Sequence, residues 1–213
     1  TAAGKGTRQY PATNAVQKEL FPLVDINGIT KPTIQFVVEE AMSAGIKEIA
    51  VIVQPGEEAA FQSHFQPLTD EAALSFKSKP WGLEVSDHLR RQQAAITFLH
   101  EHDQAGFGHA VYCARDWAAG EPVLLMLGDH VYVSNQPETC AQQLRQAWQR
   151  YQTTIFGAMQ TPARLLSLFG TLAGDALKEQ PGAYRIDRIY EKPTPEYARE
   201  NLVTAGLATD HFL

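Results

Sequence analysis

The sequence predicts an α/β fold in which a mostly parallel sheet carries helices on both faces. Over about the first 160 residues, apolar segments of strand-like composition alternate with segments of helical periodicity, and such alternation is typical of βαβ units. The strand candidates there are almost continuously apolar, as in sheets buried on both faces. Beyond residue 165 the pattern changes to period-two alternation, which favours a small β-hairpin part.

Helices are predicted where apolar residues recur every three or four positions. The first covers 32–45, because Pro32 suits a first turn and Gly45 suits a C-cap. A polar segment, 70–95, is predicted to be helical with a break at Lys-Pro-Trp-Gly, 79–82. The other predicted helices are 57–65, 108–117 and 137–152, and Thr209 or Asp210 is expected to cap a last one that begins within 209–213.

Strands are predicted where short apolar runs lie between these helices. In the first part of the chain they are 46–54, 95–101, 122–129 and 153–160. In the last part, 169–174 and 183–193 alternate with the period of a hairpin, and 201–209 is predicted as one more strand. Residues 25–32, DINGITKP, are expected to form a turn around Asn27-Gly28.

Length and composition indicate one globular domain without a membrane or nucleic-acid role. The chain has 213 residues, 44% hydrophobic and 20% charged, with a net charge of −6. A nucleic-acid groove would need a dense basic stripe, and no apolar run approaches the roughly 18 residues of a membrane span. The two cysteines, Cys113 and Cys140, are too few for a disulfide framework, so we expect buried thiols in the reducing cytoplasm.

A glycine-rich loop, AAGKGTR, stands at residues 2–8. Glycines allow close approach of the backbone to a ligand, and successive N–H groups can bind phosphate oxygens. The segment lacks the third glycine of a dinucleotide-binding loop and the spacing of a P-loop. Taken alone, it fits a tight structural turn equally well.

Several further motifs follow this loop in a fixed order. They are KELFPLVD, KPTIQFVVEEAMSAGIKEI, GFGHAVYCARD, LLMLGDHVY, YEKP and NLVTAG. Together they resemble the sugar-1-phosphate nucleotidylyltransferases, and most closely the bacterial UTP–glucose-1-phosphate uridylyltransferases, or UDP-glucose pyrophosphorylases. The resemblance runs over nearly the whole chain. It is strongest in 2–65 and 106–131, and poor in 66–100.

The resemblance implies a Rossmann-like sheet, Mg²⁺ as cofactor, and transfer of a nucleotidyl group from a nucleoside triphosphate to a sugar-1-phosphate. It assigns about 1–160 to the nucleotide and about 161–213 to the sugar. Arg8 and Lys18 would be catalytic, and cations are what a reaction between two anions requires. The implied nucleotide contacts are Ala2, Ala3, Gly4, Gly6, Thr7, Glu101, Gly106 and Gly108. Without the resemblance, Lys18 would be interpreted as a solvated surface lysine.

Asp129 ends the apolar run LLMLGD. A carboxylate at the carboxyl end of a parallel strand faces the crevice where such sheets bind ligands, and carboxylate oxygen suits Mg²⁺. The resemblance makes Asp129 a metal ligand; a helix cap or an ordinary loop acid is the alternative. It also places a second metal-binding aspartate beyond Leu213. A glycine-rich loop of this kind normally follows a complete strand, of which only Thr1 and Ala2 are present. We therefore expect the chain to be incomplete at both ends.

The sugar-phosphate contacts implied by the resemblance lie in the last part of the chain. Glu191 would accept from sugar hydroxyls and Lys192 would meet the phosphate dianion. Gly170 would lie beside the hexose, and Asn201 would contact a sugar hydroxyl. An exposed ion pair at a strand end is the alternative for Glu191 and Lys192.

The base-contacting position departs from the family pattern. Glu101 stands where the relatives place a glutamine on uracil, and a small gap in the alignment would bring Gln104 there instead. A carboxylate only accepts hydrogen bonds, whereas a glutamine amide also donates them, so the residue that contacts the base stays open between Glu101 and Gln104. The histidines His100, His102 and His109 are near one another in sequence but lack an acid or cysteine at zinc spacing.

Two classes of function follow. The first is an enzyme that acts on small molecules, either a uridylyltransferase that uses UTP and glucose-1-phosphate or a thymidylyl-type transferase. A homo-oligomer is compatible with this function. The second is a non-catalytic relative that binds or senses a nucleotide sugar.

Overall fold

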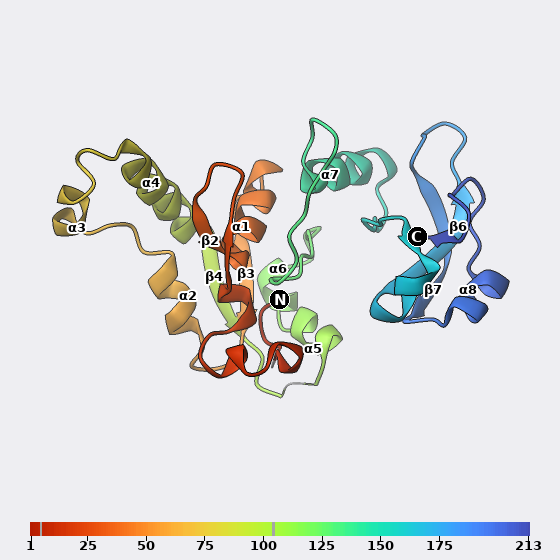
Figure 1. The fold of residues 1–213 in the computed structure, drawn as a ribbon, viewed down its shortest axis with the longest axis horizontal. Helices are drawn as coiled ribbons and strands as arrows, with labels where there is room; N and C mark the ends of the chain where they lie inside the picture. Colours follow the sequence, from red (N-terminus) through yellow and green to blue (C-terminus); the bar gives the residue numbers. More distant parts are fainter. Residues whose placement is uncertain (5, 104) are drawn as a thin grey trace. The chain divides into compact units, whose positions relative to one another are not determined.

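The computed structural model describes residues 1–4, 6–103 and 105–213, and for Arg8 the backbone alone. The chain divides into two compact units, Thr1–Thr153 and Thr154–Leu213, which are described separately below. Figure 1 shows helices interspersed with strands in both. The predicted α/β class is confirmed.

The first unit contains most of the helices. Its strands are β1 (Pro22–Val24), β2 (Thr30–Pro32), β3 (Ile49–Val53) and β4 (Ile96–His100). Its α-helices are α1 (Thr33–Ser43), α2 (Glu58–His64), α3 (Asp70–Leu74), α4 (Pro80–Ala95), α5 (Phe107–Tyr112), α6 (Arg115–Ala118) and α7 (Cys140–Tyr151). Three short 3₁₀ helices precede them, η1 (Thr7–Gln9), η2 (Ala12–Asn14) and η3 (Lys18–Leu20).

The parallel pair β3–β4 forms the centre of this unit (Figure 1). Ile49 pairs with Ile96 and Val53 with His100, and α2, α3 and α4 make the crossover. The core is apolar: Ile34 and Val38 of α1 and Phe61 of α2 are almost fully buried against β3. Burial on this scale is the main source of stability for a helix–sheet layer.

A third extended segment, Thr1–Ala3, lies beside β3. The Ala2 N–H donates to the Ile52 carbonyl at 2.8 Å. On the other side the Thr1 amino group donates to the Met126 carbonyl at 2.9 Å, and the Gly128 N–H donates to the Thr1 carbonyl at 3.0 Å. The backbone order is therefore β4, β3, segment 1–3 and segment 126–128.

Two predicted strands are wrong as regular elements. Neither 122–129 nor 153–160 is a strand in the structure. Among the described residues, 122–129 forms backbone pairing bonds only with Thr1, and these two bonds are too few for a strand ladder. Apolar residues of these runs are exposed, among them Val123 and Met159, so apolar composition did not identify a strand here.

The predicted helices are found with shifted ends. Helix α1 begins after Pro32, and Gly45 follows it with φ 79°. The break in 70–95 covers 75–79 and overlaps the predicted 79–82 at Lys79. Pro80 then starts α4, because proline is well suited to a first turn. The helix predicted at 108–117 is divided into α5 and α6. Thr139 and Gln142 form a capping box that begins α7.

The second unit contains β5 (Thr161–Pro162), 3₁₀ helix η4 (Ala163–Leu168), β6 (Gly170–Ala176), β7 (Tyr184–Glu191), α8 (Pro195–Asn201) and β8 (His211–Phe212). The predicted hairpin is confirmed as the antiparallel pair β6–β7, with an irregularity at Ala173/Gly174. Leu166, Ala198 and Leu202 pack in its core with the fully buried Ala173.

Two predictions in this unit are wrong. Residues 201–209 form no strand, because Asn201 ends α8 and the chain then turns. Residues 209–213 begin no helix but form β8, paired with β5. Asp210 cannot cap a helix here, since its carboxylate binds Arg199 at 2.8 Å and its backbone has φ 57°.

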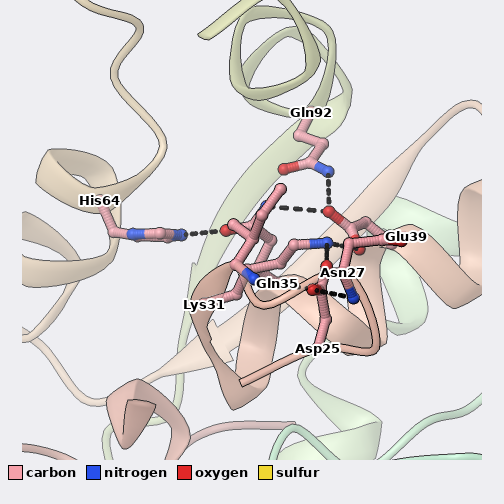
Figure 2. Close-up of polar contacts among 8 residues, drawn as sticks. Asp25, Asn27, Lys31, Gln35, Glu39, His64 and Gln92 are labelled. Carbon is pink, nitrogen blue, oxygen red and sulfur yellow. Dashed lines mark hydrogen bonds and ion pairs between the residues drawn. The ribbon is translucent and has the colours of Figure 1, made fainter. Parts of the chain in front are cut away.

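A polar network fixes the hairpin β1–β2 to α1 (Figure 2). The Asp25 carboxylate accepts from the N–H groups of Asn27 and Ile29, which confirms the predicted turn. Lys31 Nζ lies 2.9 Å from Asp25 and 3.0 Å from Glu39 on α1. One cation therefore connects the hairpin to the helix behind it.

The same network continues to α2 and α4 (Figure 2). Glu39 accepts from Gln35 at 2.8 Å and from Gln92 of α4 at 3.3 Å. Because the Gln35 amide nitrogen donates to Glu39, its oxygen is free to accept from His64 Nε2 of α2, 3.0 Å away. Gln35 and Gln92 are each 2% exposed, and buried polar groups of this kind are costly unless bonded.

Burial and charge shift the pKa values within the network. Burial would lower the pKa of Lys31, but its hydrogen bonds and charge interactions with Asp25 and Glu39 outweigh it and raise that pKa. The hydrogen bond from Lys31 is the main reason that the pKa of Asp25 is lowered. Burial lowers the pKa of His64, against a smaller opposing effect of Glu39.

The lowered pKa of His64 predicts a loss of stability in mild acid. Below pH 6.5, the ordinary pKa of a histidine, His64 binds a proton in the unfolded chain but not in the folded chain. The free energy of unfolding therefore falls as the pH drops toward the pKa of His64 in the folded chain. One such group contributes a slope of at most about 1.4 kcal/mol per pH unit. We expect the free energy of unfolding, measured in urea at several pH values between 7.5 and 5.5, to fall less steeply with pH for His64→Gln than for the unmodified protein.

The matched control is His88→Gln, which changes an exposed histidine of α4. Its slope should follow that of the unmodified protein. Equal slopes in all three proteins would contradict the assignment to His64.

Candidate active site

Lys18 and Asp129 are the centre of the candidate site, although 111 positions separate them in sequence. Lys18 Nζ lies 2.5 Å from Asp129 Oδ2 and 3.1 Å from Glu19 Oε1. The side chains of Lys18 and Asp129 are 17% and 23% exposed, and that of Glu19 is 1% exposed. The trio combines one cation with two carboxylates at the edge of the solvent.

The extended segment at residues 1–3 places this trio. Its bond to Gly128 brings Asp129 to the end of the sheet, and Gln54 donates to the Ala3 carbonyl at 2.8 Å. Lys18 comes from the 3₁₀ turn η3, which packs against α1. The turn η3 and the segment that ends at Asp129 therefore meet where residues 1–3 leave the sheet and the glycine-rich loop begins.

The glycines of the loop lie close to their neighbours. A Cβ on Gly4 would lie 3.3 Å from Lys18 Cε, and one on Gly6 would lie 2.7 Å from Thr13 Cγ2. Gly6 also has φ 60°, a conformation unfavourable for other residues, and precedes the turn η1 that holds Thr7 and the backbone of Arg8. The loop backbone thus packs directly on Lys18.

Opposing effects set the pKa values of the trio. Burial would lower the pKa of Lys18 and raise that of Asp129, but their hydrogen bond and mutual charge reverse both directions. The pKa of Lys18 is therefore raised and that of Asp129 is lowered. Glu19 differs, since burial is the largest effect on it and raises its pKa.

Sequence reasoning missed two residues of this site. Glu19 is buried beside Lys18, and a Cβ on Gly128 would lie 2.8 Å from the Thr1 carbonyl. Glu19 follows Lys18 directly, and Gly128 precedes Asp129. Their motifs were recognised, but nothing in the sequence distinguishes a buried acid from a solvated one.

Glu101 lies at the carboxyl end of β4, and its N–H donates to the Val53 carbonyl at 2.9 Å. Its side chain is buried and lies 3.0 Å from His109 Nδ1 of α5. Gly106 has φ 103° and precedes this helix, and a Cβ on Gly106 or Gly108 would meet no atom within 4 Å. Gln104, the other residue considered for the base, lies outside the described residues.

The residues expected at the sugar phosphate belong to the second unit. Gly170 pairs with Glu191 at the end of the hairpin β6–β7. The Lys192 N–H donates to the Phe169 carbonyl, and its Nζ lies 3.3 Å from Glu191. Both Glu191 and Lys192 are exposed. Asn201 ends α8, not a strand, and its amide donates to the Tyr197 carbonyl.

The other chemistry-bearing groups show ordinary pairings. In the described parts of the chain, no group of three or more histidine, cysteine, aspartate or glutamate side chains could hold a metal ion. His100 lies 3.5 Å from Glu58. Cys113 and Cys140 are free and only partly buried, which corrects the expectation of buried thiols. Among the described residues, none of the helices is long and apolar enough to cross a membrane.

Comparison with known proteins agrees with this geometry. The nucleotidyl transferase family matches residues 1–208, and the chain belongs to it. A curated relative, the UTP–glucose-1-phosphate uridylyltransferase of Bacillus subtilis (strain 168), is 34% identical over 208 residues, which cover 96% of this chain and 67% of the relative. The chain thus spans about two thirds of that protein's length.

Solved structures give the same result for the fold. A structure of apo UDP-glucose pyrophosphorylase matches with a TM-score of 0.80 and 25% identity over 99% of this chain and 73% of that one. A UDP-glucose pyrophosphorylase complexed with UDP-glucose matches with a TM-score of 0.74 and 26% identity, covering 99% and 70%. The expected nucleotidyltransferase fold is confirmed.

Removing the Lys18 charge should destabilise the first unit. Lys18→Met leaves Asp129 and the buried Glu19 without their shared cation, at an expected cost of about 1–3 kcal/mol in the free energy of unfolding. Glu19→Gln in addition removes one of the unpaired charges and should recover part of the loss. Urea unfolding at pH 7 measures both.

Lys47→Met is the control, because Lys47 is exposed, and it should change stability by less than about 0.5 kcal/mol. If Lys18→Met matches this control, the trio makes no contribution to the fold.

Proposed function

We propose that the protein transfers the uridylyl group of UTP to glucose-1-phosphate and releases pyrophosphate, giving UDP-glucose. The observation that carries the proposal is the Lys18–Asp129 pair held against the glycine-rich loop. Membership of the nucleotidyl transferase family and the 34% identical uridylyltransferase of Bacillus subtilis support it.

The reaction is a displacement at the α-phosphorus of UTP. A phosphate oxygen of glucose-1-phosphate forms the new bond to this phosphorus, and the bond to the bridging oxygen of pyrophosphate breaks. Both reactants are anions, so the protein's main task is to position them and to offset their charge. No covalent intermediate with the chain is required.

Lys18 is proposed to offset charge at the α-phosphate. It is half-buried beside Gly4, so its charge is only partly screened by solvent. A charge pair about 4 Å apart contributes roughly 4 kcal/mol at an effective dielectric near 20. Arg8, on the next turn of the loop, is proposed to bind the leaving pyrophosphate through its planar guanidinium.

Asp129 is the residue that would hold a divalent metal. Lys18, Glu19 and Asp129 together carry one excess negative charge, so the donor set suits a hard cation such as Mg²⁺. When bound, such an ion neutralises phosphate charge. The protein residues would orient the triphosphate, and Lys18 is proposed to turn from Asp129 toward the α-phosphate.

The hairpin end of the second unit is proposed to bind the sugar phosphate. Glu191 and Lys192 are exposed and adjacent, with Gly170 across the strand. A carboxylate accepts hydrogen bonds from sugar hydroxyls, and an ammonium meets a phosphate dianion. Asn201 is proposed to contact a further sugar hydroxyl. We also propose that the enzyme acts in the cytoplasm.

The first test is pyrophosphate release by the purified protein over a grid of nucleotides and sugar phosphates. UTP with glucose-1-phosphate should give the highest rate among UTP, dTTP, CTP, ATP and GTP, each combined with glucose-, galactose- and N-acetylglucosamine-1-phosphate. Lys18→Ala should lower the rate by roughly a hundredfold or more, the effect of one lost charge contact. Lys47→Ala is the matched control and should be unaffected.

Binding of UTP without turnover on any sugar phosphate would favour a non-catalytic relative. A preference for dTTP would favour a thymidylyltransferase.

The metal proposal predicts a separate effect at Asp129. Turnover should stop on chelation by EDTA and return with Mg²⁺. Asp129→Asn keeps the size of the side chain but weakens its attraction for a cation, so the Mg²⁺ concentration for half-maximal rate should rise by roughly tenfold or more. Asp116→Asn, on the exposed surface of α6, is the control. An unchanged Mg²⁺ dependence would assign the metal to other residues.

A further inference from the structure

The turn that carries Lys18 is attached to helix α1 through the backbone carbonyl of Phe21. The Phe21 N–H donates to the Lys18 carbonyl at 3.2 Å and so closes the turn η3. The Phe21 carbonyl in turn accepts two hydrogen bonds from Thr33, one from its N–H at 3.0 Å and one from its hydroxyl at 3.2 Å. The attachment therefore lies one turn away from Lys18.

Thr33 is well placed to hold this carbonyl because it is the first residue of α1. The N–H groups at the start of a helix have no acceptor within the helix, and Pro32 before it supplies no side-chain cap. The Phe21 carbonyl takes the place of a cap, and its two lone pairs accept both donors. Thr33 is 5% exposed, and hydrogen bonds buried to this degree are costly to break.

The same turn of α1 lies beside the other partner of Lys18. Ile34, which follows Thr33, is 4% exposed and belongs to the apolar core. A Cβ on Gly128 would lie 3.4 Å from Ile34 Cδ1, and Gly128 directly precedes Asp129. The backbones of Lys18 and Asp129 are therefore both supported by the first turn of α1.

We propose that Thr33 is a positioning residue for Lys18, because its hydroxyl and its N–H fix the turn from which the Lys18 side chain extends. This role depends on the proposed function, in which Lys18 offsets charge at the α-phosphate. Stabilisation of a transition state by a charge depends closely on position, and a displacement of about 1 Å can lower a rate by roughly a hundredfold. Thr33 acts through the backbone of Lys18 and not through a contact with substrate.

Three substitutions remove the donors of Thr33 step by step. Thr33→Ser keeps both donors, and Thr33→Val replaces the hydroxyl by a methyl group of similar size. Thr33→Pro removes the N–H as well, at a position where a helix accepts proline. Pro32 already has the extended backbone, with ψ 153°, that a following proline requires. Thr30→Val is the matched control, because Thr30 is an exposed threonine of β2.

The expected effect is on the rate of the chemical step. The kcat for pyrophosphate release from UTP and glucose-1-phosphate should fall roughly threefold to tenfold in Thr33→Val and further in Thr33→Pro, with a smaller change in the KM for UTP. Thr33→Ser should restore the rate, and Thr30→Val should leave it unchanged. In a Lys18→Ala background Thr33→Val should have no further effect, because a residue that acts through Lys18 then has nothing to position.

A second measurement needs no substrate. Amide hydrogen exchange of residues 18–21, followed by mass spectrometry, reports the opening of turn η3, which the Phe21 N–H closes. Exchange in this segment should be faster in Thr33→Val than in Thr33→Ser, and Thr30→Val should match the unmodified protein. Thermal melting checks that each variant folds.

An unchanged kcat in both Thr33→Val and Thr33→Pro would overturn the inference, as would a loss of rate that persists in the Lys18→Ala background. A protein that releases no pyrophosphate from any substrate pair would reject the proposed function. Hydrogen exchange would then decide on its own whether Thr33 holds the turn of Lys18, and equal exchange in Thr33→Val and Thr33→Ser would overturn that. The two failures are therefore distinguishable.

Discussion

The contact between Lys18 and Asp129 is the constraint on which the candidate site depends. It joins a 3₁₀ turn near the start of the chain to a residue 111 positions later, and it can form only because the segment 1–3 bonds to β3 on one side and to 126–128 on the other. The backbone hydrogen bonds set the distance, and the ion pair then stabilises the result. Glu19 is buried in the same contact, so one cation stabilises two acids.

Elements whose signals are local could be predicted from the sequence. Helix α1 and the hairpin β6–β7 carry periodic patterns with suitable turn residues at their ends, and both form. The runs 122–129 and 153–160 have strand-like composition but form no regular ladder. Apolar composition predicts burial. A strand also needs a neighbouring segment whose backbone groups are free to pair with it, and composition does not specify that neighbour. The same reason explains why 209–213 pairs as β8 instead of beginning a helix.

The sequence predicted the charged residues of the candidate site but not which side chains are buried beside them. Motifs identified Lys18 and Asp129 as charged residues of the right type, and the structure brings them within 2.5 Å of each other. Glu19 and His109 were not assigned a role, because what distinguishes them is burial and partner choice. Burial and partner choice depend on residues that are distant in sequence or belong to another element. For Glu19 one such residue is Asp129, and for His109 it is Glu101, which follows β4.

The Lys18 and Glu101 contacts stabilise buried carboxylates in two different ways. Near Lys18 one cation lies between two carboxylates, those of Glu19 and Asp129. At Glu101, which is 4% exposed, the partner of the carboxylate is instead Nδ1 of His109, 3.0 Å away. A buried carboxylate is costly without a partner, so each contact keeps an acid at this end of the sheet. The proposed function makes use of the first contact, because a cation shared by two acids is also the group that a triphosphate attracts.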